Sequence, residues 1–181
     1  MNPQSPATRA AAWALVGGVI ASLVLIVPQL PGSARGSRLA DYAALAAGLL
    51  AVQLGLGASA RADAGFRERM QCATIIAAIV SLLTGLGAYL LFAALRPMLL
   101  ADRYAAQQRA LAGSSAAPER LTRELVSLAD RKAQYLDPAF QAFSTAGTLF
   151  FFGMLLGAFG AWRAHVARRL RPPPARAGGS G

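Results

Sequence analysis

Four long stretches without a charged residue constrain the fold of this chain more than any other feature. They lie between Arg9 and Arg35, Asp41 and Arg61, Arg69 and Arg96, and Asp137 and Arg163, and contain 25, 19, 26 and 25 residues. None of the 26 Lys, Arg, Asp and Glu residues of the 181-residue chain falls within them. A helix needs about 20 apolar residues to cross a bilayer, and a charge at its centre costs about 2.5–3.5 kcal/mol. The pattern therefore predicts four transmembrane helices.

We expect an all-α integral membrane protein, because backbone polar groups in lipid must be paired within their own segment. The predicted spans cover residues 11–30, 41–59, 72–95 and 142–162, within a transmembrane domain that extends over 11–171. An extramembrane helical loop at 96–141 separates the third and fourth spans. An N-terminal tail at 1–10 and a Pro- and Gly-rich C-terminal tail at 172–181 complete the chain.

Two alternatives to this interpretation have less support. A soluble helical bundle keeps one polar face on each helix, and the windows Ile75–Ile79 and Leu149–Phe159 have none. Charged residues make up only 14% of the chain, against about a quarter in soluble proteins. A cleaved signal peptide would have an apolar run of about 7–15 residues and an A-x-A site, whereas the first span is longer and no such site follows it.

The loop between the third and fourth spans is predicted to form a helical hairpin. Gly113 begins a Gly-Ser-Ser break, and Pro118 suits the first turn of a second helix. Leu121, Leu125 and Leu128 repeat at helical spacing in that helix, and Glu119 and Arg123 are spaced as ion-pair partners. The leucine stripe packs on the other arm of the hairpin or on the bilayer surface, or it makes residues 98–136 a docking face for a protein partner.

Small residues within the spans predict close helix packing. We expect this role at the spaced pairs Gly18 and Ser22, Ser81 and Gly85, and Gly153 and Gly157. Gln53 joins them as an interhelical hydrogen-bonding group, because an amide in hydrocarbon needs a partner on another helix. The same motifs are compatible with a homo-oligomer.

The basic C-terminal segment is predicted to bind the anionic headgroups of membrane lipids. Its residues Arg163, Arg168, Arg169 and Arg171 follow the fourth span directly, and each base near an anionic leaflet contributes about 1 kcal/mol. The spacing of Trp162 and Val166 favours continuation of the fourth helix into this segment. Nucleic acid is not expected as a partner, since the segment lacks interleaved aromatic residues and any nucleic-acid-binding motif.

The orientation in the membrane follows from where the basic residues lie. With both termini inside, each side of the membrane receives nine Lys and Arg residues. The positive-inside rule gives most weight to bases close to the span ends. Five Arg follow the fourth span within 163–176, whereas the bases of the long loop are spread along it. We therefore expect cytoplasmic termini and a periplasmic loop.

The sequence offers no catalytic, cofactor-binding or metal-ligating constellation. Cys72 and His165 are the single members of their types, which excludes the common Cys–His and multi-histidine sites. The four charge-free windows contain no Lys, Arg, Asp or Glu, the ionisable groups that usually mark intramembrane chemistry. We expect a non-enzymatic protein that acts by helix packing or by partner and lipid interaction. The alternative is a subunit of a small oligomeric transporter or channel, which predicts that Gln53, Thr84 and Thr148 line one continuous path.

The layout resembles a family of small bacterial inner-membrane proteins of unknown function that have four spans. The resemblance rests on the segment Gly65-Phe66 before the third span, on Tyr135-x-Asp137-Pro138 at the end of the loop, and on Gly153-x-x-x-Gly157. It implies four spans with a helical loop between the last two and location in the bacterial inner membrane, and it supplies no activity. The use of 17 Arg against one Lys also fits a GC-rich bacterial gene.

Overall fold

The computed structural model describes residues 5–30, 38–59, 64–114 and 117–169. These residues form helices and turns, and no strand occurs among them, which confirms the all-α prediction. The predicted C-terminal tail at 172–181 lies outside the described residues, as do Arg171 and the first four residues of the predicted N-terminal tail.

Four long helices form a bundle, and each is long and apolar enough to cross a membrane. They are α1 (Pro6–Ile26), α2 (Arg38–Ser59), α3 (Phe66–Leu90) and α7 (Pro138–Arg169). This arrangement is compatible with a multi-pass membrane protein. Each helix begins a few residues before its predicted span, because the charge-free windows report the apolar part of a helix and not its capped end. The Asp137 carboxylate, for example, accepts a hydrogen bond from the backbone N–H of Ala139 at 2.8 Å and so caps α7.

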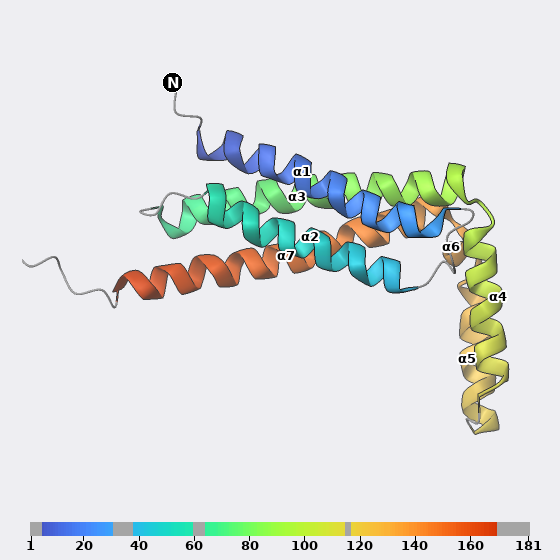
Figure 1. Cartoon of the computed structure of the whole chain (residues 1–181). Coiled ribbons are helices and arrows are strands. Elements are labelled where there is room, and N and C mark those ends of the chain that lie inside the picture. The colour runs from blue at the N-terminus through green and yellow to red at the C-terminus, as the bar shows by residue number, and fades with distance from the viewer. Residues whose placement is uncertain (1–4, 31–37, 60–63, 115–116, 170–181) are drawn as a thin grey trace, which may run out of the picture.

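The helix α3 lies at the centre of the bundle and contacts α1, α2 and α7 (Figure 1). Its buried side chains include Ile76 and Val80, which form one core with Val52 of α2 and Leu149 of α7. The start of α1 and the end of α7 lie at the same end of the bundle (Figure 1), as an even number of antiparallel long helices requires. We call this the terminal end.

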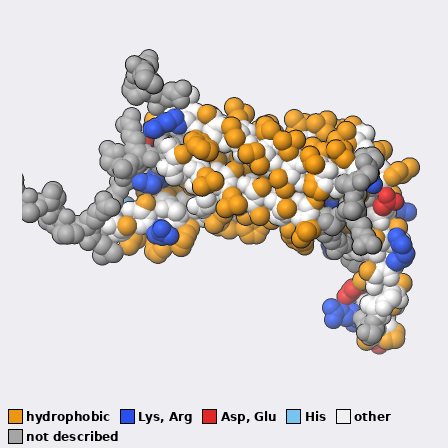
Figure 2. Space-filling view, in the orientation of Figure 1, with side chains coloured by type: hydrophobic (Ala, Val, Ile, Leu, Met, Phe, Trp, Pro, Cys, Tyr) orange, Lys and Arg blue, Asp and Glu red, His pale blue; other side chains and the backbone are white. Residues whose placement is uncertain are grey.

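The outer surface of the bundle is apolar along most of its length. Large hydrophobic side chains such as Leu82 and Phe143 are exposed to 71% and 77%. On the face shown in Figure 2, hydrophobic side chains cover the middle of the bundle, while Lys, Arg, Asp and Glu gather toward its ends and on the projecting helices. An exposed apolar surface of this extent is typical of a contact with lipid or with other proteins.

At the opposite end, α3 ends in a π-helical turn, η2 (Leu91–Leu95), which the backbone N–H of Arg96 closes by donating to the Leu91 carbonyl at 2.7 Å. Arg96 leaves the helical conformation, with φ −141° and ψ 66°, as expected for a residue before proline. The chain then turns into α4 (Leu99–Ala112), which does not continue the direction of α3 (Figure 1).

Two helices project from this end across the direction of the bundle: α4 and α5 (Pro118–Asp130), followed by the short α6 (Lys132–Leu136). We call α4 and α5 the arm. Leu128 is the buried member of the predicted leucine stripe, while Leu121 and Leu125 are half-buried. The predicted ion pair of Glu119 with Arg123 is not found. Arg120 and Glu124, each one residue further along the chain, form an ion pair at 2.9 Å instead.

Candidate functional site at the junction of the arm and the bundle

Small residues allow α3 and α7 to approach closely at three levels. A Cβ placed on Gly85 would lie 2.8 Å from the Cβ of Ala146. The corresponding distances are 3.1 Å from Gly153 to Ala77 and 2.5 Å from Gly157 to Ala73. Contacts this short leave no room for a side chain, so these glycines set the separation of the two helices.

The predicted pair on α1 packs against α3. A Cβ on Gly18 would lie 2.7 Å from a methyl carbon of Leu83. The Ser22 hydroxyl is placed 2.8 Å from the Gly18 carbonyl of its own helix and 3.0 Å from the Leu83 carbonyl of α3. Ser81, although buried, donates only to carbonyls of its own helix, those of Ala77 and Ala78.

Gln53 does not take the position that the sequence suggests. Its side chain is exposed on α2, and its amide makes no hydrogen bond to another helix among the described residues. It lines an open cleft near the terminal end together with Arg163, which is also exposed. Arg168 and Arg169 belong to the last turn of α7, but their side chains lie outside the described part of the chain.

The most developed polar cluster lies where the arm meets the bundle, and it is centred on Gln29. This side chain lies in η1 (Val27–Gln29), directly after α1, and is completely buried. Its amide nitrogen donates to the Leu25 carbonyl at 2.8 Å, and its amide oxygen accepts from Arg103 at 2.6 Å. The Gln29 backbone carbonyl accepts from Arg96 at 2.7 Å. Both sides of the amide are therefore used within the cluster.

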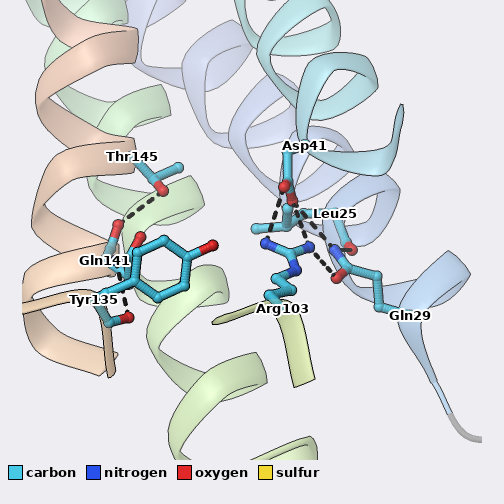
Figure 3. Close-up of polar contacts among 7 residues, drawn as sticks. All are labelled: Leu25, Gln29, Asp41, Arg103, Tyr135, Gln141 and Thr145. Carbon is cyan, nitrogen blue, oxygen red and sulfur yellow. Dashed lines mark hydrogen bonds and ion pairs between the residues drawn. The ribbon is translucent and has the colours of Figure 1, made fainter. Parts of the chain in front are cut away.

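Arg103 of α4 connects this cluster to α2. Its guanidinium makes two contacts with the Asp41 carboxylate, an ion pair of 2.9 Å and a hydrogen bond of 3.1 Å (Figure 3). It also stands 5.5 Å from the ring centroid of Phe92, a cation–π distance. Bidentate Arg–carboxylate pairing is directional as well as strong. Together with the contact to Phe92, it fixes α4 relative to the starts of α2 and η2.

A cleft of about 210 Å³ opens beside this cluster, between α2 and α7. We call it the arm-end cleft. Its polar lining consists of Asp41, Tyr42, Thr84, Arg103, Gln141, Ser144, Thr145 and Thr148. Thr84 and Thr148 therefore share one cleft, as the transporter alternative predicts, but Gln53 does not line it. The buried core around Val52, Ile76 and Leu149 lies between this cleft and the terminal end.

The hydroxyl and amide groups of the arm-end cleft are partly used by their own helices. Thr84 donates to the Val80 carbonyl and Thr145 to the Gln141 carbonyl, each at 2.8 Å. The Gln141 amide nitrogen donates to the Tyr135 carbonyl at 3.1 Å (Figure 3). These groups offer hydrogen bonds, while the one carboxylate of the cleft is held by Arg103. The chemistry available here is that of binding and positioning.

Sequence reasoning missed Gln29 and the pairing of Asp41 with Arg103. Two signals were present: an amide beside Pro28 at the end of a span, and a carboxylate at the start of the next one. Charged residues at span ends are costly to bury and usually have partners. The partner, Arg103, is 62 residues further along the chain, so no local spacing identifies it.

Comparisons with known proteins do not identify the chain. No family model, curated protein or solved structure matches it. The resemblance to four-span bacterial proteins therefore stays a prediction, and function must be argued from the geometry. Among the described residues, no group of three or more His, Cys, Asp or Glu side chains is placed to hold a metal ion.

Proposed function

We propose that this chain is a non-enzymatic, multi-pass protein of the bacterial inner membrane that presents its arm outside the bilayer as a docking module. The observation that carries the proposal is the junction of the arm with the bundle. Arg103 ties α4 to Asp41 of α2 and to the buried Gln29, so the arm is held in one orientation at the end of an apolar bundle. A module that must meet a partner at a defined position benefits from such preorganisation.

The surface of the bundle supports its insertion in a membrane. Its exposed apolar side chains would be costly in water, at about 25 cal/mol per Å² of apolar surface. The arm, in contrast, exposes charged side chains along its length, including Asp102, Arg109 and Asp130. We infer that the bilayer ends near the junction and that α4 and α5 lie outside it.

The distribution of basic residues supports cytoplasmic termini and a periplasmic arm. Arg9, Arg67, Arg69 and Arg163 belong to the ends of α1, α3 and α7 at the terminal end. On the arm, bases alternate with carboxylates, and one base is neutralised in the Arg120–Glu124 pair. The positive-inside rule gives most weight to bases next to span ends, which favours the terminal end as the cytoplasmic one.

A groove between α4 and α5 supplies a docking face with a definite charge. Arg120, Arg123, Glu124 and Arg131 line it together with apolar atoms of Leu111 and Leu128. Arg120 is paired with Glu124, while Arg123 and Arg131 form no ion pair within the described residues. We therefore expect a partner that presents acidic side chains, since complementary charge sets the specificity and rate of association.

Charge reversal tests this docking proposal. A photo-crosslinking residue at Val126, which is 55% exposed on α5, should capture a partner in native membranes. Arg123→Glu together with Arg131→Glu should abolish that product, and Arg109→Glu on α4 should leave it intact. Deletion of residues 98–136 that changes neither the crosslinked partners nor the phenotype would exclude the docking role.

The second candidate is a subunit of an oligomeric transporter or channel. It is favoured by the hydroxyl-lined arm-end cleft, which contains both Thr84 and Thr148. The position of Gln53 in a different cleft opposes a continuous path through one chain. Liposomes that contain the purified protein and show no flux for ions or small polar solutes would exclude this candidate.

A further inference from the structure

The helix α5 has a second stripe of side chains, on the side opposite its leucines. Glu119, Arg123, Val126 and Asp130 follow one another at spacings of four, three and four residues, so they share one face of the helix. All four are exposed, and Val126 is the large apolar member at 55%. A rotation of about 100° per residue places this face away from the leucine stripe. We call it the outer face of α5.

The outer face holds opposite charges that do not pair with each other. Arg123 and Asp130 are seven residues apart, which is about 10 Å along the helix at about 1.5 Å per residue. Neither of them forms an ion pair within the described part of the chain, where the ion pair of the arm joins Arg120 to Glu124. The Arg123 Nε donates to the backbone carbonyl of Glu119 at 3.3 Å, so the only printed partner of this guanidinium is uncharged. A base and a carboxylate on one helix face are thus both available to a partner.

An open depression of about 360 Å³ covers this part of α5, and the spacing of its lining is symmetric. It is lined by Thr122, Arg123, Val126, Ser127, Asp130 and Arg131. The spacing of these six residues is the same from either end, about a midpoint between Val126 and Ser127. A second α5 that runs antiparallel and is centred on this midpoint therefore brings its Asp130 to Arg123 and its Arg123 to Asp130. The outer face is complementary in charge to a copy of itself.

The direction of the arm suits an antiparallel contact within a membrane. The helices α4 and α5 project across the direction of the bundle (Figure 1), so a bundle that spans the bilayer places α5 along the membrane surface. Two copies in one membrane have the same orientation, and a two-fold axis that relates them runs along the bundle. Such an axis is perpendicular to α5 and makes the two α5 helices antiparallel. A two-fold contact uses the same surface of both subunits, which is what the charges of the outer face require.

We infer that the outer face of α5 joins two copies of this chain, and that the acidic partner of the arm is therefore a second copy. This proposal rests on the proposed function, which places the bundle in the membrane and assigns the arm to docking. Two ion pairs of Arg123 with Asp130 form, one on each side of the axis, and the two Val126 side chains meet beside it. A contact between two helices of 13 residues is small for a stable dimer. We expect it in the membrane, where the copies share one plane, and not in dilute detergent.

The test exchanges charges between copies of the full chain in native membranes. A photo-crosslinking residue at Val126 should give a product with twice the mass of the chain. Arg123→Asp and Asp130→Arg should each reduce this product about tenfold, because each variant places like charges at both ends of the contact. Co-expression of these two variants with different affinity tags should restore the product as a mixed dimer, since both Arg–Asp contacts are then regained. Arg109→Asp, a reversal at an exposed position of α4, should leave the product unchanged.

The crosslinked product also separates the self-contact from the docking role on which it rests. A product that joins the chain to a different protein would overturn the second copy as the occupant and leave the docking role in place. The absence of any product from Val126 would overturn both. A mixed dimer that fails to form, or an equal loss in Arg109→Asp, would overturn the pairing of Arg123 with Asp130. Release of the chain by carbonate extraction would refute the membrane location itself.

Discussion

Two clefts lie between α2 and α7, one toward each end of the bundle, and they differ in chemistry. Between them the helices approach closely, since a Cβ on Gly48 would lie 2.7 Å from a Leu149 methyl carbon. At the arm end, Arg103 is paired with the Asp41 carboxylate. This ion pair connects α4 to α2, and we call it the joint. Near the terminal end, Gln53 and Arg163 line the other cleft, and Arg163 is exposed and forms no ion pair within the described residues. The comparison teaches that Arg103 stabilises the protein's own geometry, whereas Arg163 faces the surroundings of the protein.

The largest expected loss of stability comes from removing the carboxylate that pairs with Arg103 at the arm end. Asp41→Asn leaves Arg103 without its carboxylate, at a site where the arginine side chain is 17% exposed and Asp41 is 36% exposed. Removing one partner of a fully buried pair costs about 3–5 kcal/mol. Because water reaches Asp41, we expect a loss of about 2–3 kcal/mol, which reversible unfolding in mixed micelles would measure.

The matched control for this variant is Glu124→Gln on α5. It breaks an Arg–carboxylate pair of the same length, 2.9 Å, whose side chains are 74% and 41% exposed. Exposed pairs of this kind contribute about 0.2–1 kcal/mol. Equal losses in the two variants would show that the joint at the arm end is an ordinary surface contact, and the contrast between the two ends would disappear.

The next prediction concerns the crossing point that separates the two clefts. Gly48→Leu forces a side chain against Leu149, which is 1% exposed and has little room to move. Overpacking of this kind costs about 1–3 kcal/mol, and we expect a loss within this range because the buried Leu149 side chain must shift to admit the new one. The same unfolding assay would measure the loss.

Gly147→Leu is the control for the crossing, since a Cβ at Gly147 meets no atom within 4 Å. It should leave the free energy of unfolding almost unchanged. If both variants were tolerated equally, α2 and α7 would not be in contact at this level, and the two openings would form a single gap.

These contrasts show where sequence reasoning succeeds and where it ends. The spans were predictable because the absence of charge over about 20 residues reflects a large and local cost. The joint was not predictable, because Gln29, Asp41 and Arg103 meet only after three helices have packed, at separations of 12 to 74 residues. A single sequence does not show which residues of separate helices lie at the same level, so a buried partner cannot be assigned from spacing alone.

Side-chain direction was equally inaccessible from the sequence. Gln53 was expected between helices, but its direction depends on the rotation of α2 about its axis, which packing against α1, α3 and α7 decides. The shift from Glu119 and Arg123 to Arg120 and Glu124 has a similar cause, because both pairs have the spacing of one helical turn. The π-helical turn at Leu91–Leu95 likewise left no trace in the hydrophobic pattern.

The smallest expected effect tests the hydroxyl groups that lie within the bundle itself. The Ser22 hydroxyl lies 3.0 Å from the Leu83 carbonyl on another helix, whereas Ser81 donates only within α3. Interhelical hydrogen bonds in membrane proteins contribute about 0.6 kcal/mol on average. Ser22→Ala should therefore lower the free energy of unfolding by about that amount, and Ser81→Ala by clearly less. A loss in Ser22→Ala as large as that in Asp41→Asn would place the main polar restraint inside the bundle, and the joint at the arm end would no longer be what distinguishes the two ends.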